Sequence, residues 1–157
     1  ILDAQAGYEC ALNILLTAAA GANMIQYSVG TLEFTKTGSY ELLVIGNEIL
    51  GMVSRILQGI EVNDETLALD VIRKVGPGGH YLSQKHTLEH LKKEQYFPAI
   101  TDRRSYQAWK AAGAKEIGTV AREEVKRILK EHQPEPLDND IVKELEKIIE
   151  ELERQQT

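Results

Sequence analysis

Met24-Ile25-Gln26-Tyr27-Ser28-Val29 is the most strand-like stretch of this 157-residue chain. From Ile25 onward every second residue is apolar, which is the pattern of a β-strand with one buried face. Helical patterns lie on both sides of it, over residues 3–20 and 39–58. Because the order helix, strand, loop, helix is typical of α/β folds, we expect this stretch to be a buried strand.

The rest of the chain is predicted to be turns and helices. A polar, turn-like segment covers residues 30–38. Apolar residues recur at helical spacing over residues 64–75, 83–95, 105–112, 116–131 and 138–154. One strand cannot form a sheet by itself. The sequence therefore predicts either a mainly helical structure or a sheet whose other strands belong to a preceding N-terminal portion or to a partner chain.

The composition excludes several classes of protein. With 43% hydrophobic and 27% charged residues, the chain suits a globular domain or a part of one. Its longest apolar run, residues 42–52, is interrupted by glycines and polar residues, so no membrane-spanning helix is expected. No secretory signal pattern opens the sequence, which favours a cytoplasmic protein. The net charge of −6 argues against nucleic acid as a partner.

The sharpest literal motif is His86-Thr87-Leu88-Glu89-His90, which has the H-x-x-E-H form of an inverted zinc protease. Its two imidazoles share one face of a helix. A catalytic zinc needs a third protein ligand as well, and the sequence singles out none of the acidic residues that follow. We therefore favour a structural role for the two histidines and keep zinc hydrolysis through His86, Glu89 and His90 as a third hypothesis.

A polar cluster at the start of the first helix is a candidate binding site for a cation. Gln5 and Glu9 lie one helical turn apart, beside Asp3. Quaternary and protonated amines are held by carboxylates and aromatic faces together. Such groups would come from Tyr8, Tyr27 and Glu33 if the strand and the helix start meet. The residues by themselves favour the alternative, a well-capped first helical turn, because acidic residues stabilise helix N-termini.

Three further features have structural interpretations. Glu48 interrupts an apolar helix, and since a buried carboxylate needs a partner, we expect a structural salt bridge. Gly76-Pro77-Gly78-Gly79-His80-Tyr81 lacks the spacing of a nucleotide-binding loop and is interpreted as a tight turn. Cys10, the single cysteine, excludes an internal disulfide and a cysteine-based zinc site, and we expect a small core residue there.

The stretch Asp102-Arg103-Arg104 has two interpretations. Together with Trp109 it could recognise a phosphate or another anionic partner. Alternatively, Arg103 or Arg104 pairs with Asp102 and a helix carbonyl, which is the commoner arrangement. We favour this second, structural interpretation.

Taken together, an ordered series of short motifs resembles the C-terminal part of the trimethylamine–corrinoid methyltransferase family. The likeness covers nearly the whole chain, without one decisive signature. Its motifs are Asp3-Ala4-Gln5-Ala6-Gly7-Tyr8-Glu9, Gly21-Ala22-Asn23, Gly30-Thr31-Leu32-Glu33, Asn47-Glu48, Gly59-Ile60, Thr66-Leu67-Ala68, Gly79-His80-Tyr81-Leu82, His86-Thr87, Pro98, Asp102-Arg103, Tyr106, Trp109 and Gly113.

The resemblance implies a (β/α)₈ TIM barrel with its active site at the C-terminal ends of the strands. In this chain it implies the C-terminal portion of that barrel over residues 1–133, predominantly helical with one or two short strands, and a docking helix over 134–157. Some family members carry pyrrolysine and others use quaternary amines such as glycine betaine. We expect any pyrrolysine upstream of Ile1, and interpret the start at isoleucine as a sign of a longer polypeptide.

The implied reaction moves a methyl group from a methylated amine to the cobalt of a separate corrinoid (cobalamin) protein. No cofactor or metal is then bound directly by this chain, and its partners are the cognate corrinoid protein, the amine and further copies of itself. We hypothesise that Gln5, Glu9, Tyr27 and Glu33 form the rim that holds the cation, and that His80 and His86 lie near the approaching corrin. The alternative from another class is a helical interaction or assembly module without catalysis of its own.

Overall fold

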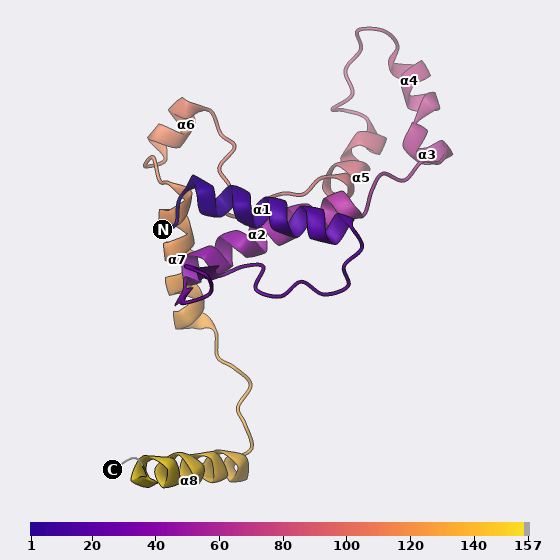
Figure 1. The fold of residues 1–157 in the computed structure, drawn as a ribbon. Coiled ribbons are helices and arrows are strands. Elements are labelled where there is room, and N and C mark those ends of the chain that lie inside the picture. Colours follow the sequence, from indigo (N-terminus) through magenta and orange to yellow (C-terminus); the bar gives the residue numbers. More distant parts are fainter. Residues whose placement is uncertain (156–157) are drawn as a thin grey trace. The chain divides into compact units, whose positions relative to one another are not determined.

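The computed structural model describes residues 1–155 (Figure 1). These residues fall into two units, Ile1–Arg127 and a second that begins at Ile128. Helices account for most of the regular structure, with one small sheet. The elements are α1 (Ala4–Ala19), β1 (Thr31–Leu32), β2 (Thr37–Gly38), α2 (Tyr40–Leu57), α3 (Asp64–Leu67), α4 (Leu69–Val75), α5 (Lys85–Glu94), α6 (Tyr106–Ala111), α7 (Ile117–Glu131) and α8 (Asn139–Gln155).

The core of the first unit lies between α1 and α2, which pack against each other (Figure 1). Both helices begin as predicted, because Asp3 Oδ1 accepts a hydrogen bond from the Ala6 N–H at 3.1 Å and Ser39 Oγ accepts one from the Leu42 N–H at 3.1 Å. The buried apolar side chains are those of Ile14, Leu42, Ile45, Val53 and Ala121. Ala121 belongs to α7, and burial of the other four side chains stabilises the helix pair.

The predicted strand over residues 24–29 is wrong, and the sheet lies in the segment that was predicted to be a turn. β1 and β2 pair antiparallel, with Thr31 opposite Gly38 and Leu32 opposite Thr37. A strand needs a neighbour for its backbone groups. The tight turn over residues 33–36 folds the chain back, so that β2 lies beside β1 and pairs with it. In the described part of the chain, no strand pairs with residues 24–29.

Helices with a two-stranded sheet are consistent with part of an α/β domain. The prediction of a mainly helical chain with one or two short strands is therefore confirmed. Within residues 1–155 the strands do not form a barrel, because the sheet consists of β1 and β2. The (β/α)₈ architecture remains an expectation from the resemblance.

One predicted helix is divided in two. Instead of a single helix over residues 64–75, α3 ends and α4 begins at Ala68, whose backbone is left-handed with φ = 50°. Asn63 and Thr66 form a capping box before the break, with the Asn63 side chain accepting from the Thr66 N–H at 2.9 Å. The spacing of apolar residues over 64–75 did not indicate the break at Ala68, because it predicts one continuous helix.

Two glycines of α2 allow other segments to approach the helix closely. A Cβ at Gly46 would lie 2.3 Å from Val29 Cγ1, and a Cβ at Gly51 would lie 2.4 Å from the Tyr96 hydroxyl oxygen. Side chains at these positions would overlap with their neighbours. The contact at Gly46 holds the end of residues 24–29 against α2.

In the second unit, α8 follows a segment that contains Pro134 and Pro136. Its apolar seam is solvent-exposed along its length, at Ile141, Leu145, Ile148 and Leu152. Among the described helices, none is both long enough and apolar enough to cross a membrane.

Candidate functional site

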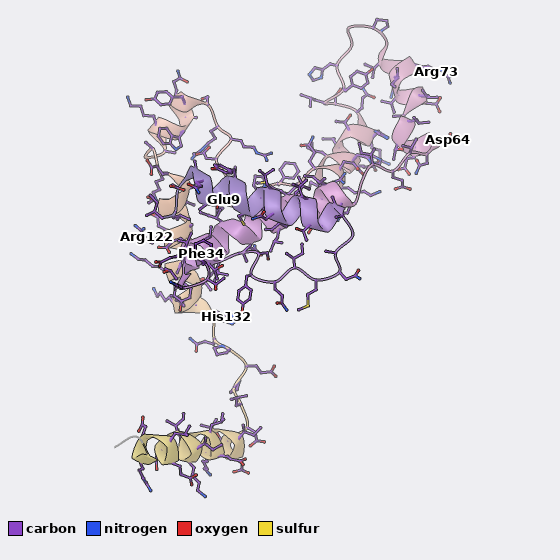
Figure 2. All side chains as sticks on the ribbon, in the orientation of Figure 1. Glu9, Phe34, Asp64, Arg73, Arg122 and His132 are labelled. Atoms are coloured by element: carbon purple, nitrogen blue, oxygen red, sulfur yellow. The ribbon has the colours of Figure 1, made fainter. Side chains whose placement is uncertain are left out.

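A pocket of about 580 Å³ lies where the start of α1 meets the segment from residue 27 to the β1–β2 hairpin. All four residues predicted to form the rim line it: Gln5 and Glu9 come from α1, Tyr27 from the connecting segment, and Glu33 from the hairpin turn. Figure 2 labels Glu9 on α1 and Phe34 beside the hairpin. The tertiary structure thus brings together residues that are distant in the sequence. The most widely separated of the four, Gln5 and Glu33, are 28 positions apart.

Unusual backbone conformations shape this pocket. Tyr27, Glu33, Phe34 and Thr35 all have positive φ, between 51° and 68°. Left-handed backbone is sterically costly for residues with a side chain, above all for a β-branched one such as Thr35. These four residues all line the pocket. In a regular strand, successive side chains point to opposite faces. The left-handed backbone of Glu33, Phe34 and Thr35 instead lets three successive residues line the same pocket.

The electrostatic character of the pocket is set by two carboxylates. Glu9 Oε1 accepts a hydrogen bond from Gln5 Nε2 at 2.8 Å, and Glu33 Oε2 accepts one from Thr37 Oγ1 at 3.1 Å. Both donors are neutral, so neither hydrogen bond cancels a negative charge. An adjoining hollow of about 600 Å³ shares Gln5, Glu9 and Glu33 and adds Asp3. Asp3 also caps α1. It therefore has the predicted capping role and lies in the predicted polar cluster with Gln5 and Glu9.

Phe34 and Cys10 are among the pocket residues that were not predicted from the sequence. Phe34 lines it with a side chain that is 97% exposed, and its position next to Glu33 was the available signal. Cys10 also lines it, and its thiol donates to the Ser28 carbonyl oxygen at 3.2 Å. Burial raises the pKa of the Cys10 thiol, which favours the uncharged form. Cys10 is half-buried and lies outside the buried core in which it was expected, and its hydrogen bond joins the connecting segment to α1.

Of the two histidines predicted to lie near the corrin, His86 lines a hollow to which His80 does not contribute. His86 lines a hollow of about 420 Å³ together with His90 and Arg55, whereas His80 follows the tight turn of Gly76 and Gly78, which both have positive φ. The interpretation of that glycine-rich stretch as a turn is confirmed. Whether His80 and His86 approach a corrin stays a prediction.

His86 and His90 are engaged with each other and with Glu65. Their rings stack with centroids 4.2 Å apart. His86 Nε2 lies 2.9 Å from the Glu65 carbonyl oxygen, and His90 Nε2 lies 3.3 Å from Glu65 Oε1. The third member of the motif, Glu89, pairs instead with Lys85 at 3.3 Å. Within residues 1–155 no group of three His, Cys, Asp or Glu side chains could hold a metal ion, so the motif has no third ligand there.

Glu48 has partners other than the predicted salt bridge. Its side chain is buried, with 5% of the residue exposed, and accepts backbone hydrogen bonds from Ala99 at 3.0 Å, Ile100 at 3.0 Å and Thr101 at 2.8 Å. Burial raises the pKa of this carboxyl, but the three N–H donors outweigh it and hold the pKa below its usual value. The salt-bridge prediction was wrong because an approaching loop satisfies the carboxylate without a cation.

Asp102 and Arg104 form the predicted structural pair. Arg104 donates through Nε to Asp102 Oδ1 at 3.0 Å and through NH2 to Oδ2 at 2.6 Å, and its backbone N–H adds a bond of 2.9 Å. The Arg104 guanidinium lowers the pKa of Asp102 to about 2. Trp109 Nε1 donates to the Lys115 carbonyl oxygen at 2.9 Å, which fixes the ring beside this pair's pocket.

Comparison with known proteins identifies the family to which this chain belongs. A family model described as trimethylamine methyltransferase (MTTB) matches residues 1–156. The chain belongs to this family.

Curated relatives of the trimethylamine methyltransferase family resemble the chain along nearly its full length. Trimethylamine methyltransferase MttB2 of Methanosarcina mazei is 45% identical over 154 residues, which are 98% of this chain and 31% of that protein. Trimethylamine methyltransferase MttB of Methanosarcina barkeri is 44% identical over 152 residues, 97% of this chain and 30% of that protein. The glycine betaine methyltransferase of Desulfitobacterium hafniense is 36% identical over 148 residues, 94% of this chain and 31% of that protein.

The chain therefore spans about 30% of the length of the curated relatives that it matches. Family membership confirms the resemblance drawn from the short motifs. It assigns no role to an individual residue. The contribution of Gln5, Glu9, Tyr27 and Glu33 has to be argued from the pocket that they line.

Proposed function

We propose that this chain is the C-terminal part of a (β/α)₈-barrel methyltransferase that moves a methyl group from a methylated amine to the cobalt of a corrinoid protein. Membership of the trimethylamine methyltransferase family supports the reaction. The observation that carries the site is the meeting of Gln5, Glu9, Tyr27 and Glu33 in one pocket. A pocket with two carboxylates and an aromatic ring is suited to an alkylammonium cation.

The proposed role of the pocket is to capture and orient the amine. When the methyl carbon leaves, the nitrogen keeps the bonding electron pair and loses its positive charge. The Glu9 and Glu33 carboxylates consequently stabilise the bound cation more than the transition state, and contribute through binding and positioning. The Tyr27 ring adds an apolar face against which the methyl groups can pack.

We assign the corrinoid to a separate carrier protein, as the resemblance implies. When bound there it supplies the cobalt nucleophile, which is chemistry that no side chain offers. The lining of the pocket includes the carboxylates of Glu9 and Glu33, which fits a small cation better than a largely apolar macrocycle. We place His80 and His86 near the docked carrier, and infer a cytoplasmic enzyme that forms homo-oligomers.

The test uses the complete methyltransferase that contains this chain, assayed with its corrinoid protein and trimethylamine. Replacing Glu9 by Gln or Glu33 by Gln removes one charge each, and we expect KM to rise about tenfold while kcat does not fall, since a hydrogen bond to a charged group is worth about 1.5–3 kcal/mol and the lost charge stabilises the bound cation more than the transition state. Tyr27→Ala should slow demethylation without unfolding the enzyme. Asp70→Asn, on the exposed surface of α4, is the control.

Unchanged KM in both glutamate variants together with full turnover in Tyr27→Ala would remove these residues from the amine site. Circular dichroism of each variant separates loss of binding from loss of folding. No methyl transfer from any methylated amine by the wild-type enzyme would contradict the proposed function as a whole.

A second candidate function is that of a helical interaction module, and the exposed seam of α8 favours it. Ile141, Leu145, Ile148 and Leu152 repeat in steps of four and three, which is the spacing of a helix that packs on a partner helix. Leu145→Lys should weaken subunit association in light scattering while Lys147→Ala does not. If Leu145→Lys lowered the mass of the assembly but left methyl transfer intact, α8 would be an assembly element and not part of catalysis.

A further inference from the structure

Glu33 contributes its side chain to both hollows at the start of α1. It lines the pocket of about 580 Å³ and also the adjoining hollow of about 600 Å³. The residue is exposed, and its backbone is left-handed, with φ = 53°. An exposed glutamate side chain has several rotatable bonds and samples many orientations when nothing holds it. A carboxylate that is ordered only when the ligand arrives binds that ligand less tightly, because the ordering costs free energy at that step.

The Thr37 hydroxyl is placed to hold this carboxylate. Thr37 Oγ1 donates to Glu33 Oε2 at 3.1 Å, and Thr37 itself lines the adjoining hollow. A β-branched side chain is restricted at its first torsion, so this hydroxyl is a stiff donor. Hydrogen bonds to a charged acceptor are stronger than those between neutral groups. Because the donor is neutral, the bond orients the carboxylate and leaves its negative charge in place.

The hairpin fixes the distance between donor and acceptor. Leu32 is paired opposite Thr37 in the antiparallel ladder of β1 and β2. The Lys36 N–H donates to the Glu33 carbonyl oxygen at 3.1 Å and closes the turn between the two strands. Glu33 therefore leaves β1 beside the residue at which β2 begins. Since the backbone already brings the two side chains together, their hydrogen bond orders only side-chain torsions.

We propose that Thr37 is a positioning residue, whose hydroxyl holds the Glu33 carboxylate in the orientation that meets the amine. Because Glu33 belongs to the amine pocket of the proposed function, this inference rests on that function. It adds a residue to the set of Gln5, Glu9, Tyr27 and Glu33. Thr37 acts through Glu33, so its contribution to binding depends on the presence of the carboxylate.

The test measures KM and kcat for trimethylamine in the complete methyltransferase with its corrinoid protein. Thr37→Val keeps the shape of the side chain but removes the donor. We expect KM to rise about threefold while kcat does not fall, because the charge remains and only its orientation is lost. Thr37→Ser keeps the donor and should stay within about twofold of the wild-type KM. Thr119→Val is the matched control, since Thr119 is exposed on α7, outside the residues that line the two hollows.

A double-mutant cycle shows whether Thr37 acts through Glu33. Glu33→Ala removes the acceptor, so the addition of Thr37→Val should leave KM equal to that of Glu33→Ala alone. Valine favours a strand as threonine does, and circular dichroism and the thermal unfolding midpoint of Thr37→Val should therefore match those of wild type.

The outcomes separate this inference from the proposed function. A wild-type KM for Thr37→Val, with KM raised in Glu33→Ala, would overturn the role of Thr37 and leave the amine site intact. The same rise of KM with and without the Glu33 carboxylate would also overturn it, because Thr37 would then act by another route. Unchanged KM in Glu33→Ala would contradict the amine-binding role of Glu33, and with it the proposed site itself.

Discussion

The Glu48 carboxylate and the backbone N–H of Thr101 are joined by a 2.8 Å hydrogen bond between residues 53 positions apart. Two neighbouring N–H groups, of Ala99 and Ile100, bind the same carboxylate. A single buried side chain of α2 thereby fixes the segment that leads to Asp102 and Arg104. Burial and the adjacent Glu48 charge also raise the pKa of Tyr96, whose ring packs on Gly51 of the same helix.

Replacing Glu48 by Gln should lower the free energy of unfolding by about 1–3 kcal/mol, because the three backbone N–H donors lose a buried, charged acceptor with four lone-pair sites. Urea unfolding followed by circular dichroism measures the change. Glu89→Gln makes the same chemical change at an exposed site and should leave the transition midpoint where it is. A midpoint for Glu48→Gln equal to that of wild type would show that the negative charge of Glu48 contributes nothing to the stability of these hydrogen bonds.

The Asp102–Arg104 pair predicts an acid titration at unusually low pH. NMR should detect the Asp102 carboxyl titrating near pH 2, since the Arg104 guanidinium stabilises its charged form. Replacing Arg104 by Gln should return the midpoint toward the ordinary value of 3.8. Because the pKa is lowered in the folded state, the contribution of the pair to stability is present above the unfolded pKa and is lost as the pH falls through the folded one. A midpoint that stayed near 2 in Arg104→Gln would exclude Arg104 as the cause.

Alanine at two helical glycines should have opposite effects on stability. Gly46→Ala gains about 1 kcal/mol of helix propensity but forces Val29 away from α2, and overpacking of this kind costs about 1–3 kcal/mol. Gly7→Ala has open space around its Cβ and keeps the gain. Thermal unfolding should therefore give a lower midpoint for Gly46→Ala and a higher one for Gly7→Ala. An increase in the unfolding midpoint of both variants would show that Val29 does not restrict a side chain at position 46.

Glycine at Ala68 should stabilise the chain. Left-handed backbone costs an L-residue about 1–2 kcal/mol, and glycine avoids this at an entropic cost of about 0.5–1 kcal/mol, which leaves a net gain of up to about 1.5 kcal/mol. Chemical unfolding of Ala68→Gly measures that gain. Ala68→Val, with a β-branched side chain at the same φ, should be less stable than wild type, and a stability equal for all three would mean that the helix break relaxes when residue 68 is changed.

The features that the sequence alone determined depend on interactions between residues close together in the chain. Helix N-termini at Asp3, Ser39 and Ser105 were predictable because a cap bonds an N–H three residues ahead, and helical spacing repeats within one turn. The motifs that carry the family resemblance are likewise short and contiguous. A pair between Asp102 and either Arg103 or Arg104 was predicted for the same reason, and the structure shows that Arg104 is the partner.

Only the tertiary structure decided where the sheet lies and which residues meet in the pocket. Alternation over residues 24–29 indicated a strand, but pairing depends on a neighbour, and the turn over residues 33–36 gives one to β1 instead. The partners of Glu48 lie far along the chain, and so do Tyr27 and Glu33, which share a pocket with Glu9, so no local pattern encodes these contacts. Such contacts form when helix packing closes a long loop, and their free energy depends on the arrangement of the whole core and not on adjacent residues.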